Sequence, residues 1–167
     1  MVIIGAVGIA LVVRAFLLAS FFIPSESMLP TLKVGDRVLV NKAAYRFHDV
    51  HRGDVVVFER PPGLLADENV KDLVKRVIGL PGDTVEFLED HVIVNGHLLE
   101  EPYLTPGTAT KAKTLGPSMV VPPGEVLVLG DNREGSKDGR FFGPIKIGSI
   151  VGRAFLVYWP SSHIGRL

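Results

Sequence analysis

Short runs of alternating apolar and polar residues fill most of the chain from residue 37 onward, and clusters of Gly, Pro and Asp separate them. Alternation with a period of two is typical of β-strands, and such clusters are typical of turns. The pattern predicts strands at residues 37–41, 54–58, 73–78, 84–88, 91–94, 125–129 and 150–158. No long amphipathic helix is evident, and only residues 42–45 are expected to form a short helical turn. We therefore predict a mostly β fold, with antiparallel sheets in a coiled or barrel-like arrangement.

The connections between these predicted strands differ in kind. Asn95 and Gly96 lie between two apolar runs, which is a strong signal for a two-residue β-hairpin. Residues 61–70 carry a Pro-Pro-Gly run and acidic residues, and residues 105–123 are rich in Pro, Gly, Thr and Lys. We expect an ordered hairpin at Asn95-Gly96 and mobility in these two segments.

Residues 1–23 are the only candidate for a membrane segment. Residues 1–13 carry no charge but would span only about 20 Å as a helix, less than the hydrocarbon core of about 30 Å. Extending the segment to residue 23 places Arg14 near its middle, which costs about 2.5–3.5 kcal/mol on insertion scales. We therefore expect residues 1–22 to be transmembrane or membrane-associated, with Arg14 at an interface and residues 16–22 as an apolar strand or a membrane-facing edge.

A cleaved signal peptide is the alternative interpretation of the same stretch. It is disfavoured because no basic residues precede the apolar run, and because cleavage near Ala19-Ser20 would leave Pro24 only a few residues from a free terminus. The same lack of basic residues means that the positive-inside rule cannot orient the segment. Residues 23–167 are expected to form one domain with a real core.

Charge and cysteine content exclude several classes of protein. Lys plus Arg and Asp plus Glu number 18 each, so the formal net charge is zero. A nucleic-acid partner would call for a basic patch, and this balance argues against one. The absence of cysteine excludes disulfides, thiol catalysis and cysteine-ligated metals. We expect neither a cofactor nor a metal ion.

Two serines separated by one residue follow the apolar segment directly. Ser25 and Ser27 lie between Pro24 and Pro30, and in an extended backbone they point the same way. Pro24 stiffens that geometry, because it fixes its own φ and biases the preceding residue toward extended backbone. One hydroxyl is then placed to attack a carbonyl while the other donates a hydrogen bond to the oxyanion. A Ser/Pro-rich linker after an anchor is the alternative, and the motif alone does not separate the two.

A serine nucleophile needs a base that takes its proton. None of the five histidines (His48, His51, His91, His97 and His163) lies in a recognisable nucleophile or acid–base motif. A lysine serves instead if apolar surroundings keep it neutral. Lys75 shares one face of a predicted strand with Leu73 and Val77, whereas Arg76 points to the other face. The alternative for Lys75 is a snorkelling lysine at a sheet edge, and Lys146, between two isoleucines, is the only rival base.

A long polar loop follows the predicted strand at residues 125–129. Its residues Ser136, Asp138 and Arg140 alternate, so they would share one side of an extended segment. An Asp–Arg pair can clamp a backbone, and a hydroxyl can hold a neutral lysine amine in place. A solvated β-turn is the alternative, since Gly-Asp-Asn is ordinary turn chemistry.

These three blocks together resemble the type I signal peptidases (leader peptidases), membrane-anchored serine–lysine endopeptidases that remove signal peptides. Residues 24–32 resemble the nucleophile box, residues 35–40 and 52–58 the strands that follow it, residues 74–83 the lysine box and residues 130–140 the final box. The match covers nearly the whole chain in the right order. It implies a mostly β fold that agrees with the alternation, and a variable insertion, small here, at about residues 89–122.

The resemblance implies a role for each matching residue. Ser27 aligns with the nucleophile and Lys75 with the general base. The Ser25 hydroxyl aligns with the group that completes the oxyanion hole beside the backbone N–H of Ser27. The remaining matches are Ser136, which aligns with the hydroxyl that orients the lysine, and the supporting ion pair of Asp138 and Arg140.

Two positions depart from the family pattern. Glu26 stands where many members have glycine, and Gly139 stands where the last box usually has serine. Neither position carries chemistry in the family. Gly139 is expected to loosen the loop that presents its two charged neighbours.

The resemblance also implies how a substrate binds. A signal-peptide segment is expected to add as an extended strand to residues 22–25 and 72–74, with small residues before the cleaved bond. The expected pocket residues are Phe21, Ile23, Pro24, Met28, Leu32, Asp72 and Val74, of which the five apolar side chains other than Pro24 could equally be ordinary core. The expected partners are signal-peptide-bearing preproteins and membrane lipid, for a single-pass protein of the cell membrane with its peptidase domain on the extracytoplasmic side. The alternatives are another Ser-Lys peptidase, of a pilus-processing or self-cleaving type, or a non-catalytic membrane-tethered module that binds extended peptides.

Overall fold

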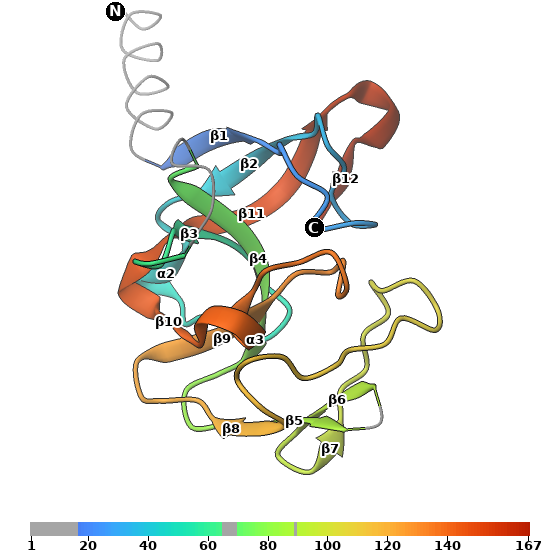
Figure 1. The fold of residues 1–167 in the computed structure, drawn as a ribbon. Coiled ribbons are helices and arrows are strands. Elements are labelled where there is room, and N and C mark those ends of the chain that lie inside the picture. Colours follow the sequence, from blue (N-terminus) through green and yellow to red (C-terminus); the bar gives the residue numbers. More distant parts are fainter. Residues whose placement is uncertain (1–16, 65–69, 89) are drawn as a thin grey trace, which may run out of the picture.

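Two antiparallel β-sheets make up the described part of the chain. The computed structural model describes residues 17–64, 70–88 and 90–167. Figure 1 shows the larger sheet in the upper part of the view and the smaller sheet, β5 to β8, at the bottom. The prediction of a mostly β fold with antiparallel sheets is therefore confirmed. All seven predicted strands are present, with ends that differ by at most one residue from the prediction.

The larger sheet has eight strands in the order β1-β2-β11-β3-β4-β9-β10, with β12 paired to β11. These strands are β1 (Leu18–Phe22), β2 (Arg37–Asn41), β3 (Val55–Glu59), β4 (Asp72–Gly79), β9 (Glu125–Leu129), β10 (Ile145–Lys146), β11 (Ile150–Trp159) and β12 (Gly165–Arg166). β1 and β10 are the two ends of the order, and within the described ranges no pairing joins them. The hydrogen bonding of this sheet is therefore open, without the closure that a barrel has.

The smaller sheet has the order β7-β6-β5-β8 and consists of β5 (Thr84–Leu88), β6 (His91–Val94), β7 (His97–Leu98) and β8 (Ser118–Val120). Asn95 and Gly96 join β6 to β7 with positive φ angles of 52° and 78°, as a two-residue hairpin requires. The hairpin prediction is confirmed. β8 lies inside the segment 105–123 that we expected to be mobile, and its pairing with β5 corrects that expectation over residues 118–120.

Helical structure in the described residues is limited to single turns. These are α2 (Ala44–Phe47), α3 (Gly139–Phe142), η1 (Ile147–Ser149) and η2 (Ser161–His163). α2 overlaps the predicted helical turn, whereas α3 was not predicted. Among the residues that the structure describes, no helix is long and apolar enough to cross a membrane.

The N-terminal expectation divides into a described and an undescribed part. β1 pairs with β2 over Leu18–Phe22, which confirms an apolar strand within residues 16–22. The predicted transmembrane or membrane-associated segment falls largely on residues 1–16, which lie outside the described residues.

Apolar side chains cover both faces of the larger sheet. On β3, Val55 and Val57 pack in one cluster while Val56 and Phe58 pack in another, because successive residues of a strand point to opposite faces. A strand buried on both faces reads as a continuous apolar run, as β3 does. The first cluster also contains Met28, so the segment after β1 is anchored in the core.

Candidate active site

The segment that carries Ser25 and Ser27 is a turn between β1 and β2. Leu29 N donates to Glu26 O at 3.1 Å and Leu32 N donates to Met28 O at 2.8 Å, so the backbone bends where we expected it to be extended. The shared orientation of the two serines survives this difference, since their Oγ atoms lie 3.3 Å apart and are hydrogen-bonded. Burial of Met28 and Leu32 in the core holds the turn in place.

Lys75 meets Ser27 from the middle of β4. Its Nζ donates to Ser27 Oγ at 2.7 Å and to Val74 O at 2.9 Å. Lys75 is only 3% exposed, so the alternative of a snorkelling lysine, with its amine in solvent, is wrong. The rival Lys146 is exposed on β10. The structure thus joins a hydroxyl and an amine that are 48 residues apart in sequence.

Burial changes the acidity of this amine. Desolvation lowers the pKa of Lys75 from 10.5 to about 8, while the negative charges of Asp138 and Asp131 act in the opposite direction. No carboxylate of the described residues is within ion-pair distance of Nζ. A tenth or so of the Lys75 side chains are consequently neutral near pH 7.

Ser136 lies beside the nucleophile segment but forms no hydrogen bond. It is 3% exposed, and its Oγ has no partner among the described residues. Gly130 lies close to both Ser136 and the nucleophile segment. A Cβ built on Gly130 would lie 2.2 Å from Ser136 Oγ and 2.5 Å from Ser27 O. The expected hydrogen bond from Ser136 to the lysine is therefore not formed in this structure, although the hydroxyl is buried next to the site.

Asp138 and Arg140 form a buried ion pair through a helix cap. Arg140 Nε donates to Asp138 Oδ1 and Arg140 Nη2 to Asp138 Oδ2, both at 2.8 Å. Asp138 also accepts from Gly130 N at 3.0 Å, which ties the loop to the end of β9. The pairing matches the expected clamp, but the extended alternation through Arg140 is wrong, because Asp138 is the N-cap of α3.

Gly139 does not loosen this loop as we expected. The residue is buried, and a Cβ built there would lie 2.7 Å from Leu127 Cδ1 and 2.8 Å from Val128 O. Glycine at this position lets α3 pack directly on β9, which makes the presentation of Asp138 tighter.

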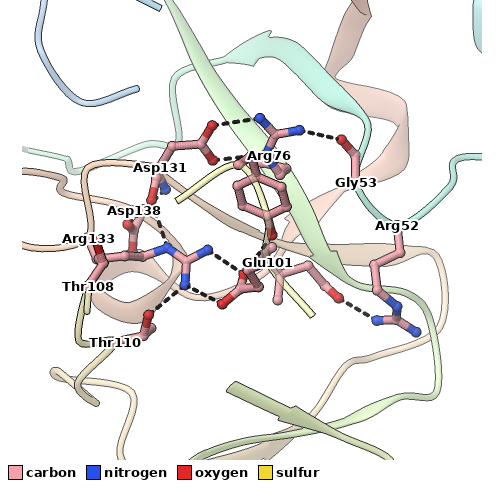
Figure 2. Close-up of polar contacts among 12 residues, drawn as sticks. Arg52, Gly53, Arg76, Glu101, Thr108, Thr110, Asp131, Arg133 and Asp138 are labelled. Atoms are coloured by element: carbon pink, nitrogen blue, oxygen red, sulfur yellow. Dashed lines mark hydrogen bonds and ion pairs between the residues drawn. The ribbon is translucent and has the colours of Figure 1, made fainter. Parts of the chain in front are cut away.

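Two further arginines, which the sequence analysis did not assign to the site, surround it with buried ion pairs (Figure 2). Arg76 donates to Asp131 from Nε at 2.9 Å and from Nη2 at 2.6 Å, and its guanidinium lies 3.9 Å from the ring centroid of Tyr103. Arg133 donates to Glu101 at 2.5 and 3.0 Å and to Thr110 at 2.6 Å. For Arg76 the signal in the sequence was a charge within an apolar run, since a buried charge requires a partner. Arg133 lies in a polar loop and gave no such signal.

Asn132 was also missed and touches the nucleophile segment directly. Its backbone N donates to Ser27 O at 3.1 Å, and its Nδ2 donates to Glu26 O at 3.1 Å. The Gly-Asp-Asn turn, for which a solvated β-turn was the alternative interpretation, therefore holds the backbone of Ser27. Within the described ranges, no group of three or more potential metal ligands is close enough to hold an ion.

A cavity of about 270 Å³ opens beside Ser27 and Lys75. Six of the seven predicted pocket residues line it: Phe21, Ile23, Pro24, Met28, Asp72 and Val74. Leu32 does not line it and is fully buried core, which corrects its assignment to the pocket. Phe22, Leu73 and the exposed Lys137 line the cavity in addition.

Comparison with known proteins identifies the class. The profile of the signal peptidase family, peptidase S26, matches residues 1–159, and the chain belongs to this family. The chain is therefore a serine endopeptidase of the signal peptidase I type, which removes signal peptides. This membership decides against a non-catalytic peptide-binding module.

Several curated relatives match nearly the whole chain. A probable signal peptidase I-2 of Synechocystis sp. is 41% identical over 98% of this chain and 73% of its own length. Signal peptidase I of Leptolyngbya laminosa is 42% identical over 97% and 79%, and signal peptidase IB of Staphylococcus aureus is 43% identical over 93% and 85%. The crystal structure of a signal peptidase I from Enterococcus faecalis V583 has a TM-score of 0.50 at 34% identity, covering 64% of this chain and 97% of that one.

Proposed function

We propose that this peptidase cleaves the signal peptides of preproteins with Ser27 as the nucleophile and Lys75 as the general base. The observation that carries the proposal is the 2.7 Å contact between Lys75 Nζ and Ser27 Oγ. A base within hydrogen-bond reach of a hydroxyl is the basic requirement for nucleophilic catalysis by serine. Burial supplies the second requirement, because it brings the pKa of Lys75 to about 8 and so leaves a usable neutral fraction.

The chemistry proceeds by acyl transfer. Ser27 Oγ attacks the scissile carbonyl carbon while neutral Lys75 takes its proton. The tetrahedral intermediate collapses, the C–N bond breaks, and Lys75 returns the proton to the leaving amine. Water then attacks the ester on Ser27 with Lys75 again as the base, which releases the signal peptide as a carboxylic acid and restores both residues.

Ser25 and the backbone N–H of Ser27 are the proposed oxyanion donors. Support comes from the Ser25 hydroxyl, which lies 3.3 Å from Ser27 Oγ and so beside the attacked carbonyl. One such donor is typically worth about 10²–10³ in rate.

The loop after β9 supports this machinery. Ser136 is proposed to turn its unpartnered hydroxyl toward Lys75 during the reaction, and Asp138 with Arg140 holds the loop in position.

The substrate is proposed to bind as an added strand. β9 pairs with β4 only at Arg76, Val77 and Gly79, so residues 72–74 have no partner on that side among the described strands. The apolar cavity of about 270 Å³ lies between this free edge and the end of β1.

The proposed location is the membrane, with residues 1–22 as a membrane-associated segment and the peptidase domain on the extracytoplasmic side. Two exposed aromatic residues on the larger sheet support contact with lipid. Phe22 is 57% exposed and Trp159 is 56% exposed, and both lie opposite Arg37 of β2, one on each neighbouring strand. Exposed apolar groups that gather in this way mark interaction surfaces.

The test uses a preprotein and the purified protein in detergent. Ser27→Ala is expected to abolish cleavage and to leave the circular dichroism spectrum unchanged, whereas Ser118→Ala, an exposed serine on β8, keeps full activity. Mass spectrometry of the product maps the cut site. Covalent labelling of Ser27 by a β-lactam-type or lipopeptide inhibitor gives independent support. Cleavage retained by the Ser27→Ala variant refutes the nucleophile assignment.

A further inference from the structure

A second cavity, of about 560 Å³, is lined by residues that follow the nucleophile in the chain, from Leu29 onward. Leu29, Pro30 and Lys33 line one side of it, residues 105–109 line another, and residues 131–134 complete it. We call it the downstream cavity. Its volume is in the range of ordinary binding sites for short ligands.

The downstream cavity begins immediately beside Ser27. Leu29, two residues after the nucleophile, is part of its wall, so it lies within about 7 Å of Ser27 along the backbone. Asn132 lines the same cavity and donates hydrogen bonds to Ser27 O and Glu26 O. The two cavities share no lining residue, but the nucleophile segment contributes to both. Ser25, Ser27 and Met28 line the apolar 270 Å³ cavity, whereas Leu29 and Pro30 line the downstream cavity.

Buried ion pairs fix the shape of the downstream cavity. Asp131 and Arg133 are both almost fully buried, the first paired with Arg76 and the second with Glu101 (Figure 2). The loop over the cavity is fixed to the same network, because Arg133 Nη1 donates to Thr110 Oγ1 at 2.6 Å. Thr108 closes a turn onto Thr105 O within that loop. The cavity is thus preformed, which lowers the entropic cost of ordering a peptide in it.

We propose that the downstream cavity binds the first residues on the carboxyl side of the cleaved bond, the segment that becomes the new amino terminus. The inference rests on the proposed function, in which the signal-peptide side occupies the 270 Å³ cavity. A substrate is one continuous chain, so the part beyond the cut must leave past Ser27 on the opposite side. Extended backbone rises about 3.3 Å per residue, so the second or third residue after the cut reaches the wall at Leu29.

The lining suits a segment of mixed polarity. Leu29, Pro30 and Ala109 are apolar, while Lys33 and Glu134 place exposed charges of opposite sign at the cavity. This mixed lining contrasts with the mainly apolar lining of the 270 Å³ cavity. A wide cavity with few buried polar contacts binds such segments without demanding one side chain.

The test compares substrates with and without residues after the cut. One substrate is an activated ester that ends at the cleaved bond, and the others are peptides with the same upstream sequence and one or four downstream residues. For the unmodified enzyme, kcat/KM is expected to rise about tenfold or more between one and four downstream residues, equivalent to about 1.4 kcal/mol. The absence of any rise overturns the proposal without reference to a variant.

A variant that fills the downstream cavity then tests whether the gain from added downstream residues arises there. Thr105 is exposed and lines this cavity, and within the described residues only its backbone carbonyl takes part in hydrogen bonds. Thr105→Trp is expected to abolish the gain from added downstream residues and to leave ester turnover within about twofold. Thr114→Trp is the matched control, because Thr114 is equally exposed on the same connecting segment but does not line the cavity. The control variant is expected to leave kcat/KM unchanged for both the ester and the peptide substrates.

Each other outcome has a distinct meaning. If Thr105→Trp lowers kcat/KM equally for the ester and the peptides, the substitution disturbs the whole site. If it lowers kcat/KM for neither, the substrate does not use the cavity. Either outcome overturns the proposal. Ester turnover that persists in the Ser27→Ala variant counts against the proposed nucleophile instead, so failure of the proposed function is distinguished from failure of the cavity.

Discussion

Lys75 and Arg76 are neighbours on β4 and almost equally buried, at 3% and 6% exposed, yet they meet opposite environments. Arg76 faces Asp131, with two hydrogen bonds to its carboxylate, and also donates to Gly53 O at 2.9 Å. Lys75 faces Ser27 and forms no ion pair within the described part of the chain. The alternation of a strand is what sends consecutive cations to two such different sites.

The difference shows that burial alone does not decide the charge of a side chain. Asp131 lies 2.6 Å from the buried guanidinium of Arg76 and supplies its countercharge. Desolvation of the Lys75 amine is only partly opposed by Asp138 and Asp131, so its pKa falls to about 8. One strand thus carries a structural cation and a candidate base side by side.

The largest expected effect comes from making position 75 resemble position 76. Lys75→Arg is expected to lower kcat/KM for a preprotein about 10³-fold or more, because a guanidinium does not lose its proton at accessible pH. Lys146→Arg, on the exposed surface of β10, serves as the control and keeps full activity. Substantial turnover by Lys75→Arg would show that another group is the base.

Replacing Arg76, the countercharge of Asp131, is expected to have the next largest effect. Arg76→Met leaves Asp131 buried without its countercharge, so the free energy of unfolding is expected to fall by about 3–5 kcal/mol. Urea denaturation measures it. The double variant Arg76→Met/Asp131→Leu is expected to recover a large part of this loss, and a double variant no more stable than the single one contradicts the explanation.

Removing the amine at position 75 is expected to stabilise the protein. The folded chain holds the Lys75 proton less tightly than the unfolded chain does, so below pH 8 the buried ammonium costs stability. Lys75→Met is expected to raise the free energy of unfolding at pH 7 by about 3 kcal/mol. The gain fades as pH rises from about 8 to 10.5, where the unfolded lysine also loses its proton. A gain independent of pH would assign the effect to packing.

The smallest expected effect is the change in kcat/KM for each pH unit. Below the lysine pKa of about 8, kcat/KM is expected to rise about tenfold for each pH unit, because only the neutral amine accepts the serine proton. Above it the rate levels off. The profile is measured on a peptide without titratable side chains, and a maximum at acidic pH argues against a lysine base.

Local sequence pattern predicted strands of both sheets, and the smaller sheet shows this most clearly. The alternation at 84–88 and 91–94 and the Asn95-Gly96 turn require only neighbouring residues, and all three appear as predicted. β8 was missed because its three residues lie in a segment rich in Pro and Gly. α3 was missed because the spacing of Ser136, Asp138 and Arg140 also fits a strand, and the N-cap that decides the matter follows from a side-chain contact.

The candidate site was predictable to a different degree. Apolar neighbours made Lys75 stand out, and the family resemblance paired it with Ser27. The ion pairs of Arg76 and Arg133 bring together residues 55 and 32 positions apart, and no local pattern encodes which partner a buried charge will meet. The bend at Ser27 was not predicted for the same reason. Asn132 and the core, which are distant in sequence, impose it on a segment whose prolines favour extended backbone.

Gly130 has a consequence for how this protein tolerates change. With Ser136 Oγ and Ser27 O at 2.2 and 2.5 Å from where a methyl group would stand, even alanine must displace both the Ser136 side chain and the Ser27 backbone. A substitution there is expected to shift Ser27 and Ser136 together, although Gly130 itself takes no part in the reaction. Screens for inactive yet folded variants should therefore find this position, which carries no side chain of its own.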